Sequence, residues 1–252
     1  MSSILTTEKL CKSFSNGGVQ QHVIKNLDLE IIEGDFTVIM GASGSGKSTL
    51  LYALSGMDKP SMGKIRFAGT EIQDYSNDQL AVFRRGNCGF VFQSVYLLEN
   101  QTVLDNVLTG ALIVQKNSPE LISKAKDLLN KVGIMEELWN KYPNQLSGGE
   151  AQRVGIVRAA INDPKILFAD EPTGQLNSAS SSDVLDIFTQ IHRNGQSIVM
   201  VTHDLKTALR GTRVLFLRDG SIAGEYRMPP YGTDDNKVRR TGLQSFLDEM
   251  GW

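Results

Sequence analysis

One glycine-rich segment constrains this chain more than any other part of its sequence, and its residues are Gly41, Ala42, Ser43, Gly44, Ser45, Gly46, Lys47, Ser48 and Thr49. It follows the apolar run at 36–40, where a buried strand would end. A strand that ends in such a turn and continues as a helix directs several backbone N–H groups, and the positive end of the helix dipole, at one point. Lys47 can then reach the β- and γ-phosphates, and the Ser48 hydroxyl can join the coordination shell of Mg²⁺. We therefore expect this loop to bind nucleotide phosphates.

Length and composition narrow the class of protein. The chain has 252 residues, 40% of them hydrophobic and 21% charged, with a formal net charge of −2. These values are typical of a globular chain and disfavour disorder or non-specific nucleic-acid binding. The cysteines, Cys11 and Cys88, have neither metal-site spacing nor the number of a disulfide framework, so we interpret them as packing residues. No run approaches the roughly 20 apolar residues that span a bilayer, so we expect any contact with a membrane to be made through a partner.

The order of apolar and polar segments predicts an α/β chain with an insertion. Short alternating runs in the first forty residues favour an antiparallel β layer, and later apolar strands alternate with helices, as in a mostly parallel sheet. We expect the core to comprise residues 1–94 and 154–228, with a helical subdomain at 95–153. A tail at 229–252 is expected to be loose until a helix whose apolar face carries Leu243, Phe246, Leu247 and Met250.

Two carboxylates end the apolar run at 166–169. Asp170, at the strand tip, is suited to hold Mg²⁺ or its water shell, because a hard cation prefers oxygen ligands. Glu171 follows it and is suited to orient or deprotonate the water that attacks the γ-phosphate. Alone, such a pair can equally cap the next helix. Beside a phosphate loop, we interpret it as catalytic machinery.

A second anion-binding motif distinguishes between the many protein families that contain such a phosphate loop. Leu146 is followed by Ser147, Gly148, Gly149 and Glu150, a bare backbone turn that opens a helix. Here residues 1–225 resemble the nucleotide-binding subunit of an ATP-binding-cassette (ABC) transporter, whose signature is LSGGQ, with Glu150 at the Gln position. The resemblance implies an α/β P-loop NTPase core with a mostly parallel sheet, an N-terminal antiparallel β layer and an inserted α-helical subdomain. It also implies a head-to-tail homodimer, in which the signature of one copy closes over the ATP of the other.

The resemblance assigns roles to three further residues. Phe14 lies where the family places an aromatic ring that stacks on adenine. Gln93 matches the Q-loop glutamine, which senses Mg²⁺ and the γ-phosphate, and His203 matches the switch histidine that hydrogen-bonds the γ-phosphate. With Glu171 and Lys47 they form the expected catalytic set, while Ser48, Gln93 and Asp170 form the expected metal set. His192 has no such setting, and we expect it on the surface.

One position departs from the family pattern. After Gly174 the family usually continues to Leu-Asp, whereas Asn177 here replaces the acidic residue with an amide. An amide forms no charge-assisted hydrogen bond across a dimer interface. The departure leaves the coupling between two ATP sites open.

Three further stretches resemble one branch of the family, which serves macrolide and antimicrobial-peptide export, lipoprotein release and cell division. They are residues 171–174, residues 83–85 before 89–93, and residues 142–143 before the signature. Within this branch the chain is similar to bacitracin-type peptide-resistance transporters. The resemblance implies ATP hydrolysis at the cytoplasmic face of the cell membrane, a separate permease and, through that permease, a sensor histidine kinase. Three alternatives stay open: a lipoprotein-release or division-type ATPase, a soluble cassette outside transport, and a binding module without catalysis.

Overall fold

The computed structural model describes residues 2–232 and 235–252, and the chain divides into two compact units. The first comprises residues 1–84 and 192–252, and the second comprises residues 85–191. These divisions differ from the boundaries expected at 94 and 153, which stay a prediction. Each unit is described by itself below.

An antiparallel sheet occupies the first part of the first unit, in the spatial order β2, β1, β4, β5. Its strands are β1 (Ser3–Asn16), β2 (Val19–Ile32), β4 (Met62–Phe67) and β5 (Thr70–Glu71). β1 and β2 pair along their whole length, because Gly17 and Gly18 form a two-residue turn at φ 58° and 83°, where glycine is favoured. The expected antiparallel β layer is present, with strands longer than the apolar runs alone indicate.

The phosphate loop rises from the second sheet of the first unit. There the order is β10, β9, β3, β8, with β3 parallel to both of its neighbours. The bounds are β3 (Phe36–Met40), β8 (Ser197–Val201), β9 (Arg213–Arg218) and β10 (Ser221–Arg227). All five residues of β3 and all five of β8 are buried, as continuous apolar strands of a parallel sheet require.

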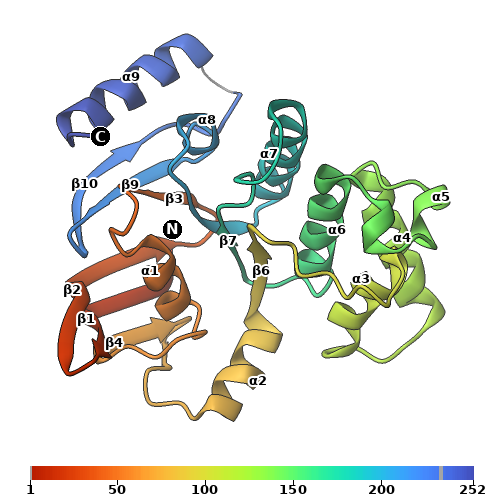
Figure 1. Cartoon of the computed structure of the whole chain (residues 1–252), viewed down its shortest axis with the longest axis horizontal. Coiled ribbons are helices and arrows are strands. Elements are labelled where there is room, and N and C mark those ends of the chain that lie inside the picture. The colour runs from red at the N-terminus through yellow and green to blue at the C-terminus, as the bar shows by residue number, and fades with distance from the viewer. Residues whose placement is uncertain (1, 233–234) are drawn as a thin grey trace. The chain divides into compact units, whose positions relative to one another are not determined.

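Helices complete the first unit. They are α1 (Lys47–Leu54), α2 (Asn77–Asn87, which runs into the second unit), α8 (Leu205–Ala208) and α9 (Asn236–Glu249). α9 lies along β10 (Figure 1), where a Cβ added to Gly224 would approach the Phe246 ring to 3.0 Å. The tail expected to be loose until Leu243 is therefore helical from Asn236. Asp235 caps it by accepting a 2.7 Å hydrogen bond from the Lys237 N–H.

A buried arginine fixes α9. Arg239 is 3% exposed and donates to the backbone carbonyls of Leu209 and Pro229, each at 2.6 Å, and to that of Gly211. Charge-assisted bonds of this kind satisfy a guanidinium that burial would otherwise make costly. The apolar stripe expected on this helix is buried at Leu243, Phe246 and Leu247, so the helix is an integral part of its unit.

The second unit joins a parallel strand pair to a group of helices. Its strands are β6 (Cys88–Phe92) and β7 (Ile166–Asp170). Its helices are α3 (Val103–Leu112), α4 (Pro119–Lys131), α5 (Glu136–Trp139), a 3₁₀ turn (Pro143–Gln145), α6 (Gly148–Ala160) and α7 (Ser178–Arg193, whose last two residues belong to the first unit). α3, α4, α5 and α6 share one apolar core, which includes Val107, Leu129 and Val157. Among the described residues, no helix combines the length and apolar character needed to cross a bilayer.

Candidate nucleotide site

The phosphate loop has the geometry of an anion cradle. It leaves β3 through Gly41, at φ 148°, and enters α1 through Gly46, at φ 100°. A Cβ on Gly41 would lie 2.2 Å from the Leu217 carbonyl oxygen, so only glycine fits there. The N-cap residue of α1 is Gly46, which has no side chain to accept a hydrogen bond, and this arrangement suits phosphate oxygens as acceptors for the N–H groups of the first turn.

Lys47 is held back onto the same loop. Its Nζ donates to the carbonyl oxygens of Gly41 at 2.8 Å and Ala42 at 3.0 Å, and the residue is 9% exposed. Phosphate oxygens offer this ammonium charge-assisted hydrogen bonds, which are stronger than bonds to neutral carbonyls. The loop thus fits the phosphate chain of a nucleotide.

Two further expected residues belong to the first unit. Phe14, on β1, is 44% exposed, so its ring is open to a ligand and is not a strand core residue. Lys12 Nζ lies 4.9 Å from the centroid of that ring. His203 is exposed and follows β8, whose Val201 pairs with Ile39. Because β3 and β8 are parallel, His203 and the start of the phosphate loop lie at the same edge of the sheet.

The other expected residues belong to the second unit. Asp170, 9% exposed, ends β7 opposite Phe92 at the end of β6, so Gln93 and Glu171 follow two paired strands at one sheet edge. A Cβ on Gly174 would lie 3.0 Å from Gln93 Nε2. The glutamine amide therefore lies against the turn after Glu171, which the 3.0 Å bond from the Gly174 N–H to the Glu171 carbonyl closes.

Glu171 also has an unusual backbone. Its φ is 46°, a left-handed conformation that a glutamate rarely adopts. Such conformations are commonly found where the surrounding structure must aim a functional side chain. Among the described residues, no group of three or more Asp, Glu, His or Cys side chains forms a metal site on its own. Within the second unit, Asp170 is thus a candidate to complete a shell supplied mainly by phosphate and water oxygens.

The second anion site opens α6 in the second unit. Ser147 caps the helix by accepting a 3.3 Å bond from the Glu150 N–H. Glu150 Oε2 in turn accepts the Ser147 N–H and the Ser147 hydroxyl, each at 2.7 Å. These bonds hold the pKa of Glu150 below its usual value, the Ser147 side chain contributing most. Gly149 packs against α7, where an added Cβ would lie 2.8 Å from the Ser180 side chain.

Two polar residues that sequence reasoning missed join α6 to the segment around Gln93. Gln152, 1% exposed, donates from Nε2 to the Phe92 carbonyl at 3.1 Å. Arg158 donates to the carbonyls of Val95 and Tyr96, each at 2.7 Å. We call these bonds the α6 clamp. They fix residues 92–96 to the helix that begins at the signature turn.

His192 was expected on the surface, and the structure corrects this. It is half-buried, with Nε2 2.9 Å from the Gly34 carbonyl oxygen and its ring centroid 5.7 Å from that of Phe36. Burial lowers the pKa of His192. The residue packs beside β3 and takes no part in the nucleotide site.

Comparison with known proteins agrees with this arrangement of motifs. Residues 24–174 match the protein family described as ABC transporter. The chain belongs to that family. It is 43% identical over 226 residues to the lipoprotein-releasing system ATP-binding protein LolD of Aquifex aeolicus, an alignment covering 89% of this chain and 98% of LolD. This cassette is also 42% identical over 228 residues to the macrolide export ATP-binding/permease protein MacB of Pectobacterium atrosepticum, covering 90% of this chain. The chain spans about a third of that MacB relative, 35% of its length.

A solved structure extends the match to the fold. The dimeric structure of a post-hydrolysis state of the ATP-binding cassette MJ0796, bound to ADP and Pi, is 35% identical. It superposes with a TM-score of 0.82 over 90% of this chain and all of that one. The expected family, branch and cassette fold are confirmed, and with them the class of ATP-hydrolysing subunits.

Proposed function

We propose that this cassette binds ATP with Mg²⁺, hydrolyses it as a head-to-tail homodimer and drives a separate membrane permease from the cytoplasmic face of the membrane. The observation that carries the proposal is the presence of two anion-binding helix starts, α1 and α6, in one chain with a carboxylate pair. Family membership and the dimeric MJ0796 structure support it. In this arrangement the α6 turn of one copy closes on the nucleotide held by the other copy's phosphate loop, which surrounds the γ-phosphate charge with donors.

Each residue then has a defined task. Phe14 stacks on the adenine, and the residues of 41–49 hold the phosphates while Lys47 neutralises them. Ser48, Asp170 and Gln93 would hold the Mg²⁺ shell, and the ion would supply positive charge that offsets the charge of the phosphates. Glu171 accepts the proton of the attacking water, and His203 hydrogen-bonds the γ-phosphate. Residues 147–150 contact the γ-phosphate from the opposing copy.

The substrate is proposed from the relatives. The MacB relative is named for macrolide export, which supports export of an antibiotic. From the family resemblance we add antimicrobial peptides as a further cargo and a sensor histidine kinase as a further contact of the permease. Lipoprotein release is a second candidate, because the LolD relative matches over nearly its whole length. Co-purification from membranes, followed by identification of the permease, separates the two.

Glu171→Gln tests the chemistry. Removing the base is expected to lower ATP turnover by about 10²–10⁴ and to trap an ATP-bound dimer. The exposed Glu99 gives the matched control, because Glu99→Gln makes the same carboxylate-to-amide change in a turn of the same unit. Turnover and monomer–dimer equilibrium are measured for both variants by phosphate release and size-exclusion chromatography. Wild-type turnover in Glu171→Gln would remove this residue as the base.

A further inference from the structure

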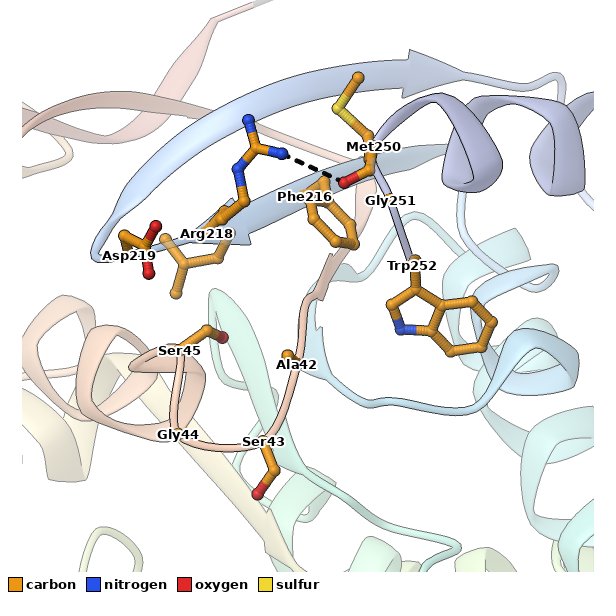
Figure 2. Close-up of a pocket in the computed structure, with 11 residues that line it drawn as sticks. Ala42, Ser43, Gly44, Ser45, Phe216, Arg218, Asp219, Met250, Gly251 and Trp252 are labelled. Carbon is orange, nitrogen blue, oxygen red and sulfur yellow. Dashed lines mark hydrogen bonds between the residues drawn. The ribbon is translucent and has the colours of Figure 1, made fainter.

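A pocket of about 200 Å³ lies beside the phosphate loop, within the first unit (Figure 2). Three segments line it: residues 42–45 of the loop, residues 216–219 at the turn from β9 to β10, and residues 250–252, which follow α9. We call residues 250–252 the strap. None of the roles assigned above uses the strap or this side of the loop.

The strap has a built conformation. Gly251 lies at φ 75°, its N–H donates to the Asp248 carbonyl at 3.0 Å, and the Trp252 N–H donates to the Leu247 carbonyl at 3.0 Å. This is the Schellman pattern, in which a left-handed glycine ends a helix and the next residue is tied back over its last turn. The direction of Trp252 is thus set by α9, which Arg239 fixes in turn.

One wall of the pocket connects the strap to the phosphate loop. Arg218 Nη1 donates to the Met250 carbonyl at 3.3 Å, the bond drawn in Figure 2. The preceding residue of the strand, Leu217, has its carbonyl oxygen 2.2 Å from where a Cβ on Gly41 would lie. Gly41 thus packs closely on β9, whereas residues 42–44 are exposed and line the pocket.

The remaining walls are an aromatic side chain and a hydroxyl with an unmet hydrogen bond. The Trp252 side chain is 42% exposed, and its indole nitrogen lies on the ring edge nearer the loop in Figure 2. The Ser45 Oγ is buried without a hydrogen-bond partner in the part of the chain that the structure describes. The Trp252 indole and residues 42–45 of the phosphate loop therefore line one pocket, and the Ser45 hydroxyl, buried beside Gly41, keeps an unmet hydrogen bond.

We propose that the strap is a nucleotide-responsive support of the phosphate loop. Phosphate bound on the inner side of residues 42–45 changes the position of their outer side, which is a wall of this pocket, and so changes the surroundings of the Trp252 indole. By linkage, the factor by which nucleotide binding strengthens the contact between Trp252 and the loop is also the factor by which that contact strengthens nucleotide binding. The inference rests on the proposed function, since it needs a nucleotide on the loop.

Intrinsic fluorescence tests the response. The chain has two tryptophans, and the other, Trp139, is buried in the second unit with its Nε1 bonded to the Ile134 carbonyl at 3.0 Å. Titration with ADP is expected to change the emission of the wild-type chain and to leave Trp252→Phe almost unchanged. An equal change in both proteins would assign the signal to Trp139 and overturn the proposal.

Calorimetric titration with ADP tests the reciprocal effect. Trp252→Ala is expected to weaken binding about fivefold, the low end of ordinary couplings. Gly251→Ala is expected to weaken it less. A Cβ at position 251 would meet nothing within 4 Å, so the substitution strains only the left-handed turn that directs Trp252. Val238→Ala, a 69% exposed position of α9, is the control with unchanged affinity.

The outcomes separate the two claims. Wild-type affinity in Trp252→Ala, with ADP binding intact, would overturn the strap and leave the proposed function standing. A wild-type chain that binds no ADP would overturn both. Thermal unfolding of each variant confirms that the fold is retained, so that a change in affinity is not the result of misfolding.

Discussion

Glu150→Gln is the substitution whose effects follow most directly from the geometry, because it changes the charge of the α6 capping box with little change in shape. Glu150 is the third residue of the helix, and its Oε2 accepts two hydrogen bonds of 2.7 Å from Ser147, the N-cap residue. Charge-assisted bonds are roughly twice as strong as neutral ones, and a carboxylate in the first turn adds about 0.3–1 kcal/mol. After allowance for partial exposure, we expect the variant to be less stable by about 1 kcal/mol at pH 7.

The pH dependence of this difference has a defined sign. The folded-state pKa of Glu150 is lowered, chiefly by the Ser147 side chain. Its stabilisation is therefore complete above the ordinary glutamate pKa and is lost as the pH falls through the folded-state pKa. Urea unfolding of wild type and variant at several pH values between 7 and 3 should show the two free energies converging in acid. A difference that stays constant over this range would refute the reasoning, as would an equal loss in Glu99→Gln.

The same substitution is expected to strengthen ATP-driven dimerisation. The carboxylate places a negative charge at a helix start that we propose to receive the γ-phosphate, and the amide removes it. A change of about 0.3–1 kcal/mol at a helix terminus corresponds to an affinity gain of about twofold to fivefold. Sedimentation with ATP in the hydrolysis-deficient Glu171→Gln background measures this. Weaker association in the double variant would contradict the role of residues 147–150.

Three further substitutions probe the second unit. Gly149→Ala forces a Cβ against Ser180 and should lower the free energy of unfolding in urea by about 1–3 kcal/mol. The ATP-bound dimer should also be lost. A dimer of wild-type stability would count against close packing at this position. Asn177→Asp should make ATP hydrolysis faster or more cooperative, and unchanged turnover and Hill coefficient would reject this. Arg158→Met removes both arginine bonds of the α6 clamp and should destabilise the unit by about 2–4 kcal/mol, with faster hydrogen exchange in residues 94–98; unaltered exchange would show that the clamp does not order that segment.

The parts of the site that the sequence predicted are those whose chemistry is local. The phosphate loop, the signature turn and the carboxylates of Asp170 and Glu171 each combine a strand or helix end with a distinctive residue pattern, so their backbone setting follows from neighbours in the chain. The capping box at Ser147 and Glu150 was also within reach, because serine followed three residues later by glutamate is a helix-start pattern. Ser147 and Glu150 also belong to the signature motif, so their residue types alone do not reveal the capping role.

The parts that were missed depend on distant partners. Arg239 and Arg158 are ordinary polar residues of helices in the sequence, and nothing near them shows that each donates to backbone carbonyls 10–63 positions away. The early start of α9 was missed for the same reason, because its first turns are polar and burial of Arg239 stabilises them. His192 was misassigned because its acceptor, Gly34, is 158 residues away.

The α6 clamp restrains the orientation of α6 as well as its position. α6 has 13 residues and is about 20 Å long, and the clamp grips it at two points six residues, or about 9 Å, apart. Two attachment points on a stiff rod resist rotation as well as sliding, whereas a single point would act as a pivot. A force on residues 92–96 therefore acts on the helix as a torque, and about 7.5 Å of helix separates Gln152 from Ser147 at the signature turn.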